Sequence, residues 1–188
     1  MSFFPAYFSL DNRKILLVGG GAIALEKLEK LVDFTLEIHT IAQEFSPEFI
    51  AFAQKHHLVM EKRSYQQGDI EGFDIVIVAT DTVALHKAIY EESRSSRILV
   101  NSVDDTAYCD FIFPSYIKRG DLTISVSTSG ASPAMAKHLR AYLERMIPPQ
   151  LEGFLAEMKG LRQTMPKGKA RMKYFEEKTK VFMQNYFQ

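Results

Sequence analysis

The first half of the chain alternates short apolar runs with amphipathic stretches. The run Lys14–Val18 is apolar and ends in three glycines, which predicts a buried strand. From Ala22 to about Phe34, apolar residues recur at helical spacing with Glu and Lys between them, which predicts a helix. Ser46 and Pro47 open another helix, as N-cap and first-turn residue. Further strands are predicted at 35–41, 57–63, 74–79 and 97–100, and a further helix at 83–95. This rhythm predicts βαβ units and a doubly wound parallel sheet.

The pattern changes after residue 100. Later elements are predicted as two strands, at 111–114 and 122–127, and three helices, at 133–146, 151–161 and 172–186. Ser132 and Pro133 mark the start of the first of these helices, and the pair at 148–149 ends it. We therefore expect a small α/β module followed by a helical tail.

Composition narrows the class of protein. Lys plus Arg and Asp plus Glu are equal at 23 each, which argues against a general nucleic-acid binder. Cys109 is the single cysteine, which excludes an intrachain disulfide and suits a reducing cytoplasm, and a buried thiol is favoured over a reactive one. The first ten residues lack a basic region, and no run approaches the roughly 18 apolar residues of a membrane helix. We expect a soluble, cytoplasmic protein.

A glycine-rich turn follows the first strand. Residues 19–24 fit G-x-G-x-x-A between a strand and a helix, the context of a dinucleotide site. Gly19 permits the tight turn, Gly21 lets the backbone approach a pyrophosphate, and Ala24 allows close helix–sheet packing. A bare glycine turn is the alternative. The cofactor residues predicted here are Gly19, Gly21, Ala22 and Ile23.

The expected ribose-binding acid at the end of the second strand is missing. The chain reads His39 to Glu44 there, so Gln43 or Glu44 serves from the following loop, or both are simply solvated. No arginine lies in this stretch to hold a 2′-phosphate, which favours NAD over NADP.

Polar residues follow the next two strands at the carboxyl edge, where ligands bind in this architecture. Thr80 and Asp81 contact the dinucleotide, cap the next helix, or do both. Asn101 begins a second such segment and joins the predicted cofactor set. In that segment Asp104 either exchanges a proton with a substrate beside the nicotinamide or, with Asp105, forms the loop.

A serine-rich turn at 125–133 presents hydroxyl and backbone donors to anionic groups. Cations follow it on the next helix, where a solvated helix face is the simpler interpretation. The predicted substrate-binding residues are Ser127, Thr128, Ser129, Gly130, Ser132, Lys137 and His138.

Taken in order, these pieces resemble the precorrin-2 dehydrogenase family. The family includes stand-alone bacterial dehydrogenases, the N-terminal half of the fused siroheme synthase, and the bifunctional yeast dehydrogenase–ferrochelatase. The matching stretches are VGGGAIALEK, VIVATDTVALHKA, LVNSVDDTAYCDFIFPS and LTISVSTSGASPAMAKHLR, over about residues 3–146. Departures are Glu26 for an arginine, His86 for a common asparagine, and Thr128 for a serine phosphorylatable in the fused enzymes.

The resemblance implies NAD-dependent oxidation of precorrin-2 to sirohydrochlorin by a homodimer. It implies a Rossmann-type NAD domain at 1–113, a dimerisation and substrate module at 114–147, and a helical segment at 148–188 that helps to cover the active site. It makes Asp104 the essential carboxylate and places NAD on Gly19–Ile23, Gln43–Glu44 and Thr80–Asp81.

Two other functions stay open. Sirohydrochlorin ferrochelatase activity, alone or in addition, would use Asp104 and His138 as the suggestive candidates. No compact His/Cys cluster is visible, and His56–His57 is most simply a surface pair, so we expect no resident metal. A non-catalytic nucleotide- or tetrapyrrole-binding module is the third possibility. No nucleic-acid or membrane partner is expected.

Overall fold

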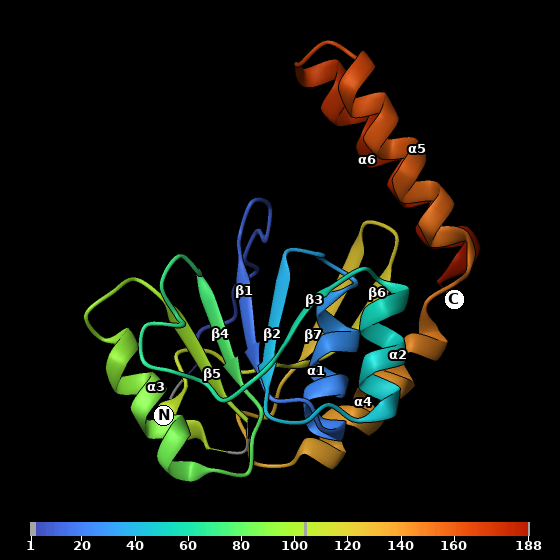
Figure 1. Cartoon of the computed structure of the whole chain (residues 1–188). Coiled ribbons are helices and arrows are strands. Elements are labelled where there is room, and N and C mark those ends of the chain that lie inside the picture. Colours follow the sequence, from blue (N-terminus) through green and yellow to red (C-terminus); the bar gives the residue numbers. More distant parts are fainter. Residues whose placement is uncertain (1–2, 104, 188) are drawn as a thin grey trace. The chain divides into compact units, whose positions relative to one another are not determined.

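The computed structural model describes residues 3–103 and 105–187. The described chain forms two compact units, one at 3–112 and one from Phe113 onward (Figure 1). We describe each unit by itself. The first carries the doubly wound sheet, and the second carries a strand hairpin and three helices.

The first unit is built on a parallel sheet of five strands in the order β3-β2-β1-β4-β5. The strands are β1 (Ile15–Val18), β2 (Ile38–Ala42), β3 (Val59–Lys62), β4 (Ile75–Val78) and β5 (Leu99–Ser102). All four residues of β1 are buried, since the strand is covered on both faces in the middle of the sheet. The predicted fold class is confirmed.

Helices connect β1 to β2, β2 to β3 and β4 to β5, while β3 leads to β4 without a helix. They are α1 (Ala22–Leu31), α2 (Pro47–Lys55) and α3 (Val83–Ser93), with a 3₁₀ turn η1 (Thr106–Tyr108) after β5. The chain adds β2 and β3 on one side of β1 and β4 and β5 on the other, and α1 and α2 lie on one face of the sheet with α3 on the other (Figure 1). The predicted cap of α2 is confirmed, because the backbone N–H of Phe49 donates to Ser46 Oγ at 3.2 Å.

The hydrophobic core between the sheet and α3 holds the central strands in place. Leu16, Val18, Val76 and Val78 from the two central strands pack with Ile89 of α3. These side chains are at most 3 % exposed, and each such burial stabilises the fold by about 1.5–3 kcal/mol. The strand ends are therefore a rigid base for the loops that follow them.

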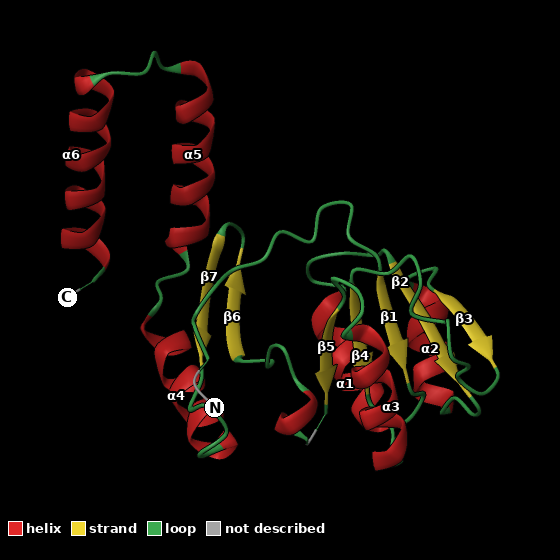
Figure 2. Ribbon diagram, turned by 90° about the vertical axis from the view of Figure 1, so that its left-hand side faces the viewer, coloured by secondary structure: helices red, strands yellow, loops and turns green. Residues whose placement is uncertain are grey.

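The second unit begins with an antiparallel hairpin of β6 (Ser115–Arg119) and β7 (Leu122–Val126). The helix α4 (Pro133–Met146) packs against both strands. Its predicted cap is confirmed, since the N–H of Met135 donates to Ser132 Oγ at 3.2 Å. The helices α5 (Gln150–Thr164) and α6 (Lys169–Tyr186) then run antiparallel, side by side (Figure 2).

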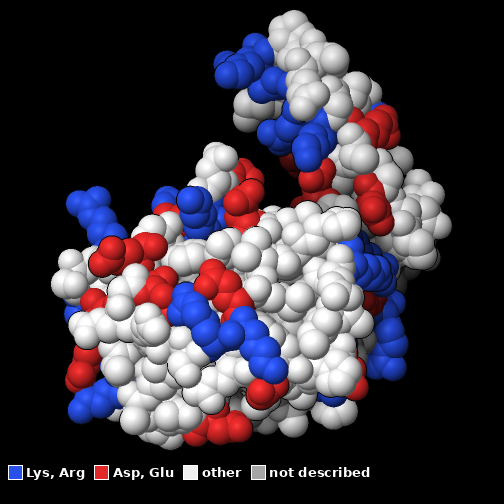
Figure 3. Space-filling model, viewed as in Figure 1, with Lys and Arg blue, Asp and Glu red and all other residues white. Residues whose placement is uncertain are grey.

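The α5–α6 hairpin is held by an aromatic stack and an ion pair. The rings of Phe154 and Phe182 lie 4.3 Å apart between centroids, and Lys178 pairs with Glu157. Figure 3 shows Lys and Arg gathered near one end of this hairpin, and the segment 162–173 contains five of them and no acidic residue. No helix in the described ranges is long and apolar enough to cross a bilayer.

One predicted strand is wrong. Residues 111–114 form no strand, and β6 instead starts at Ser115 and extends to Arg119. Pro114 has no N–H for a ladder, and the carbonyl of Phe111 accepts a hydrogen bond from Asn101 Nδ2 at 2.9 Å. The turn between β6 and β7 is therefore shorter than expected. It contains Gly120, which has a φ of +54°.

Candidate functional site

The glycine turn after β1 is shaped by close backbone contacts. A Cβ on Gly19 would lie 2.2 Å from the carbonyl oxygen of Ala79, and one on Gly20 would lie 2.3 Å from that of Glu44. Gly19 also has a φ of +134°, which side chains rarely adopt. Only glycine fits at these two positions, because the turn passes between the ends of β2 and β4.

Gly21 faces open space instead. A Cβ there would meet no atom within 4 Å, although Gly21 is the N-cap of α1. No side chain caps this helix end, and its first turn contains no acidic residue. The uncapped N–H groups and the positive end of the helix dipole together suit a phosphate group.

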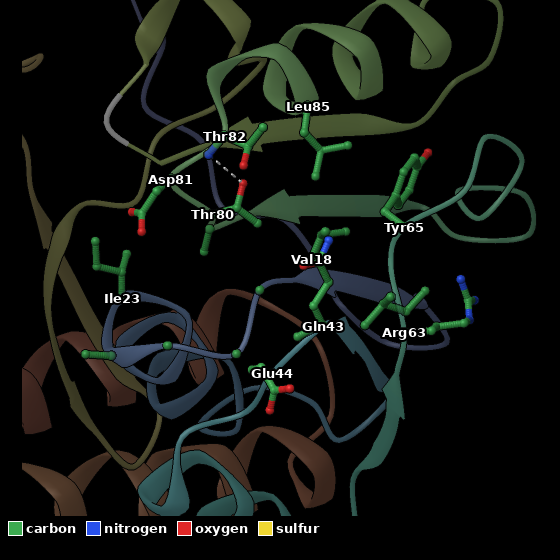
Figure 4. A pocket seen from close by; sticks show the side chains of 17 residues that line it. Val18, Ile23, Gln43, Glu44, Arg63, Tyr65, Thr80, Asp81, Thr82 and Leu85 are labelled. Carbon is green, nitrogen blue, oxygen red and sulfur yellow. Dashed lines mark hydrogen bonds between the residues drawn. The ribbon is translucent and has the colours of Figure 1, made fainter.

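A pocket of about 460 Å³ opens beside this helix end (Figure 4). It lies at the carboxyl ends of β1, β2 and β4, where ligands bind in doubly wound sheets. Its volume is in the usual range for small-molecule and cofactor sites. It is lined by Val18–Ile23, Ile41–Glu44, Arg63, Tyr65, Ala79–Thr82 and Leu85.

The predicted cofactor residues converge here with one exception. The glycine turn with the start of α1, the segment after β2 and the segment after β4 all contribute predicted residues to the pocket. These are Gly19, Gly21, Ala22, Ile23, Gln43, Glu44, Thr80 and Asp81. Asn101 does not line it: its side chain is buried, and Nδ2 donates to the carbonyl of Phe111. Asn101 thus ties the end of β5 to the chain that follows it.

A hydrogen bond from the backbone to a side chain spans the turn after β4. Thr82 is the N-cap of α3 and makes no side-chain cap, so the prediction that Thr80 or Asp81 caps this helix is wrong. Instead the N–H of Thr82 donates to Thr80 Oγ1 at 3.4 Å, a long bond across the turn. Asp81 is exposed at the pocket rim, free to meet a ligand.

The pocket lining also includes side chains that were not predicted from the sequence. Arg63, Tyr65 and Leu85 all line the wall of the pocket (Figure 4). The Tyr65 hydroxyl donates to Glu92 Oε2 at 2.8 Å, and burial together with this bond raises the pKa of Tyr65. The phenol therefore stays neutral and joins the loop after β3 to α3.

Asp104, the predicted acid/base, lies outside the described residues. The next residue in the sequence is Asp105, whose Oδ1 accepts the N–H of Ala107 at 3.1 Å and caps η1.

Cys109 is 7 % exposed, and burial raises the pKa of its thiol. Its Sγ accepts the N–H of Ser102 at 3.2 Å. The thiol is therefore a buried structural group, as favoured from the sequence.

The serine-rich turn lies in the second unit, between β7 and α4. Ser127 Oγ accepts the N–H of Ser129 at 3.1 Å, and Thr128 Oγ1 accepts the N–H of Ser132 at 3.0 Å. Gly130 allows the chain to turn with a φ of +86°. On α4, Lys137 and His138 are exposed. Because the hydroxyl oxygens accept within the turn, their protons remain available to donate to a ligand.

Metal ligands do not cluster in the described ranges. Among these residues no group of three or more His, Cys, Asp or Glu is placed to hold an ion. His57 is exposed, and His56 lies against the ring of Phe52 at 4.5 Å between centroids.

Comparison with known proteins agrees with this geometry. Residues 6–115 match the family model described as "Putative NAD(P)-binding", and residues 119–146 match the model described as "Sirohaem biosynthesis protein central". The siroheme synthase of Mannheimia succiniciproducens is 36% identical over 160 residues, which are 85% of this chain and 33% of that protein. That of Pseudoalteromonas translucida is 32% identical over 178 residues, which are 95% of this chain and 37% of that protein.

A solved structure described as "SirC, precorrin-2 dehydrogenase" has a TM-score of 0.76 and 24% identity, covering 90% of this chain and 85% of that one. The chain spans about a third of the length of the siroheme synthases it matches. Together these matches confirm the resemblance drawn from the sequence.

Proposed function

The chain belongs to the NAD(P)-binding family whose model spans residues 6–115, and from this premise we propose that it oxidises precorrin-2 to sirohydrochlorin with NAD. The observation that carries the proposal is the pocket at the end of α1. There a glycine turn, an uncapped helix end and polar residues from two further loops converge. The names of the related proteins supply the substrate class.

The chain's own residues would divide the work as follows. The backbone of Gly21–Ile23 binds the pyrophosphate, and Gln43 and Glu44 lie where the adenosine ribose would bind. Thr80 and Asp81 border the same pocket after β4. NAD, when bound, supplies the hydride acceptor.

The reaction removes a hydride and a proton from precorrin-2, and we assign the proton to Asp104. The assignment rests on the place of Asp104 in the sequence, shortly after the end of β5, and on the family resemblance. Precorrin-2 carries carboxylates, so the Ser127–Ser132 turn with Lys137 and His138 is our proposed contact for them.

A homodimer is part of the proposal, supported by an apolar stripe on α4. Met135, Leu139, Tyr142 and Met146 are 41–59% exposed and recur at helical spacing. A different face of α4, where Ala136 is buried, packs within the unit. An exposed stripe of this kind on a packed helix is typical of an interface. We place the protein in the cytoplasm, since its single thiol suits a reducing compartment.

The test is anaerobic incubation of the purified chain with precorrin-2 and NAD, following NADH and the macrocycle spectrum together. We expect sirohydrochlorin and NADH to appear in equal amounts. Binding of NAD without any turnover would refute the proposed dehydrogenase activity. A tetrapyrrole carrier or a ferrochelatase would then be the remaining functions. A parallel reaction of sirohydrochlorin with ferrous iron, without NAD, decides whether the chain also accelerates iron insertion.

A further inference from the structure

Arg63 lines the corner of the pocket where the adenosine ribose would bind, and Lys62 pairs with Glu44 at the same corner. The parallel pairing of β2 and β3 sets Ala42 opposite Lys62. The residues that follow these strands therefore lie beside one another, Arg63 next to Gln43 and Glu44. A free arginine at this corner would suit the 2′-phosphate of NADP.

Neither cation is free. Lys62 Nζ lies 2.8 Å from Glu44 Oε2. Arg63 Nε donates to Glu61 Oε2 at 2.8 Å, while Nη1 and Nη2 donate to the two carboxylate oxygens of Asp69 at 2.6 and 3.0 Å. Asp69 therefore takes both ends of the guanidinium fork, the arrangement by which arginine otherwise binds a phosphate.

Asp69 is itself held in place. Its Oδ2 also accepts the N–H of Gln66 at 2.7 Å, and the Arg63 hydrogen bonds lower the pKa of Asp69. The carboxylate therefore stays ionised at neutral pH. Counted together, Glu44, Glu61 and Asp69 face Lys62 and Arg63, so the corner carries one net negative charge.

We propose that Asp69 makes this pocket selective for NAD by holding the guanidinium of Arg63 away from the ribose position. The 2′-phosphate of NADP would be repelled by the net negative charge of this corner. It would also find the guanidinium of Arg63 already paired with Glu61 and Asp69. A ribose carries hydroxyls at the same position, and these can donate to the exposed carboxylate of Glu44. Arg63 is then a latent phosphate ligand, restrained by its neighbours. The inference rests on the proposed function and deepens it, because it names the residue that excludes NADP from a pocket proposed to bind NAD.

The test measures the binding of NADH and NADPH by nicotinamide fluorescence, without precorrin-2. In the unmodified chain we expect NADH to bind at least about tenfold more tightly than NADPH. Asp69→Asn keeps an oxygen for the Gln66 N–H and removes the charge, so NADPH affinity should rise about fivefold or more relative to NADH. Adding Arg63→Gln to that variant should abolish the gain.

Asp121→Asn is the matched control, because it removes an aspartate from an ion pair with Lys159 in the second unit. Its NADH-to-NADPH ratio should stay as in the unmodified chain. If Asp69→Asn does not fold by circular dichroism, Glu61→Gln releases the other side of Arg63 and should move the ratio in the same direction.

Equal affinity for the two dinucleotides in the unmodified chain would overturn the inference. So would a ratio that neither Asp69→Asn nor Glu61→Gln changes. Since the assay contains no precorrin-2, a failure of the dehydrogenase reaction leaves these binding ratios untouched, and the two proposals fail separately.

Discussion

The Nε2 atom of His86 lies 2.8 Å from the carbonyl oxygen of Thr80. His86 is on α3 and is only 3% exposed, while Thr80 lines the pocket. Because a carbonyl oxygen only accepts, Nε2 carries the proton of this bond. The other ring nitrogen, Nδ1, is buried without a hydrogen-bond partner among the described residues. The side chain therefore joins the buried face of α3 to the turn that lines the pocket.

We expect His86→Ala to destabilise the fold by about 1–3 kcal/mol, because it leaves a buried carbonyl unpaired and opens a cavity. NADH binding should weaken as well, since the Thr80 turn loses its anchor. His86→Asn, which keeps an N–H donor, should recover part of both losses. Urea unfolding and NADH fluorescence measure the two effects. A His86→Ala chain with normal stability and normal affinity would contradict this role.

The three glycines should separate folding from binding. Gly19→Ala and Gly20→Ala place a Cβ about 2 Å from backbone oxygens, so both should lower stability by more than about 2 kcal/mol. Gly21→Ala meets nothing in the protein and should melt at the normal temperature. Its Cβ occupies the space in front of the helix end, so NADH affinity should fall at least about tenfold. Normal NADH binding by Gly21→Ala would show that the phosphates bind elsewhere.

Much of this site follows from the sequence, because buried parallel strands appear as continuous apolar runs and their polar carboxyl ends appear next to them. That rule, the glycine motif and the family resemblance together predicted that Gly19–Ile23, Gln43, Glu44, Thr80 and Asp81 bind the dinucleotide, and all of them line the pocket. Strand ends were less certain: β2 begins at Ile38 rather than at Thr35, because its pairing with β1 starts only where Ile15 faces Ile38.

Arg63 was missed for a different reason. It stands twenty residues after Gln43, and only the register between β2 and β3 brings the two side by side. Register depends on packing between strands, which one sequence does not display. Asn101 shows the opposite case, since a polar residue at a strand end turned inward to bond the Phe111 carbonyl. Both cases involve contacts between segments that local patterns do not encode.

Asp104→Asn should separate chemistry from binding. If Asp104 takes the proton released from precorrin-2, the variant should lose turnover by about a hundredfold or more. NADH affinity should not change, since the pyrophosphate and ribose contacts are elsewhere. Asp105→Asn is the neighbouring control, because its side-chain oxygen can still accept the Ala107 N–H and cap η1. Equal turnover in both variants would remove the acid/base role from Asp104.

Stability should fall in acid partly through Asp110. Burial raises the pKa of this carboxyl, but the hydrogen bonds from Arg94 and from the Val100 N–H outweigh burial, and the net pKa is lowered. A lowered pKa contributes stability above the ordinary value of about 3.9, and that stability is lost as the pH falls through the folded-state pKa. Asp110→Asn should therefore cost about 1–3 kcal/mol at pH 7 and reduce the loss between pH 5 and pH 3.

Urea unfolding at several pH values measures this directly. Asp121→Asn, which breaks the exposed pair with Lys159, is the control and should change stability by less than about 1 kcal/mol. An acid profile identical in the unmodified chain and in Asp110→Asn would show that other carboxylates, such as Asp69 and Asp74, account for the pH dependence.

The stripe on α4 gives the sharpest test of the homodimer. Leu139 and Tyr142 lie at its middle and are 41% and 52% exposed, so their burial against a second copy would contribute several kcal/mol. Leu139→Glu with Tyr142→Glu should convert a dimer into a monomer in analytical ultracentrifugation, since two charges would have to be desolvated at the interface. Because both side chains are already exposed, the thermal stability of the single chain should not suffer.

Val59→Glu supplies the matched control, an equally exposed apolar residue on β3 in the first unit. It should remain dimeric. A monomeric unmodified chain would refute the homodimer, and a dimer that survives both glutamates would place the interface on another surface. If the monomeric variant also loses precorrin-2 oxidation while it still binds NADH, the substrate site would need residues from both copies, because the dinucleotide pocket is complete within residues 18–85 of one chain.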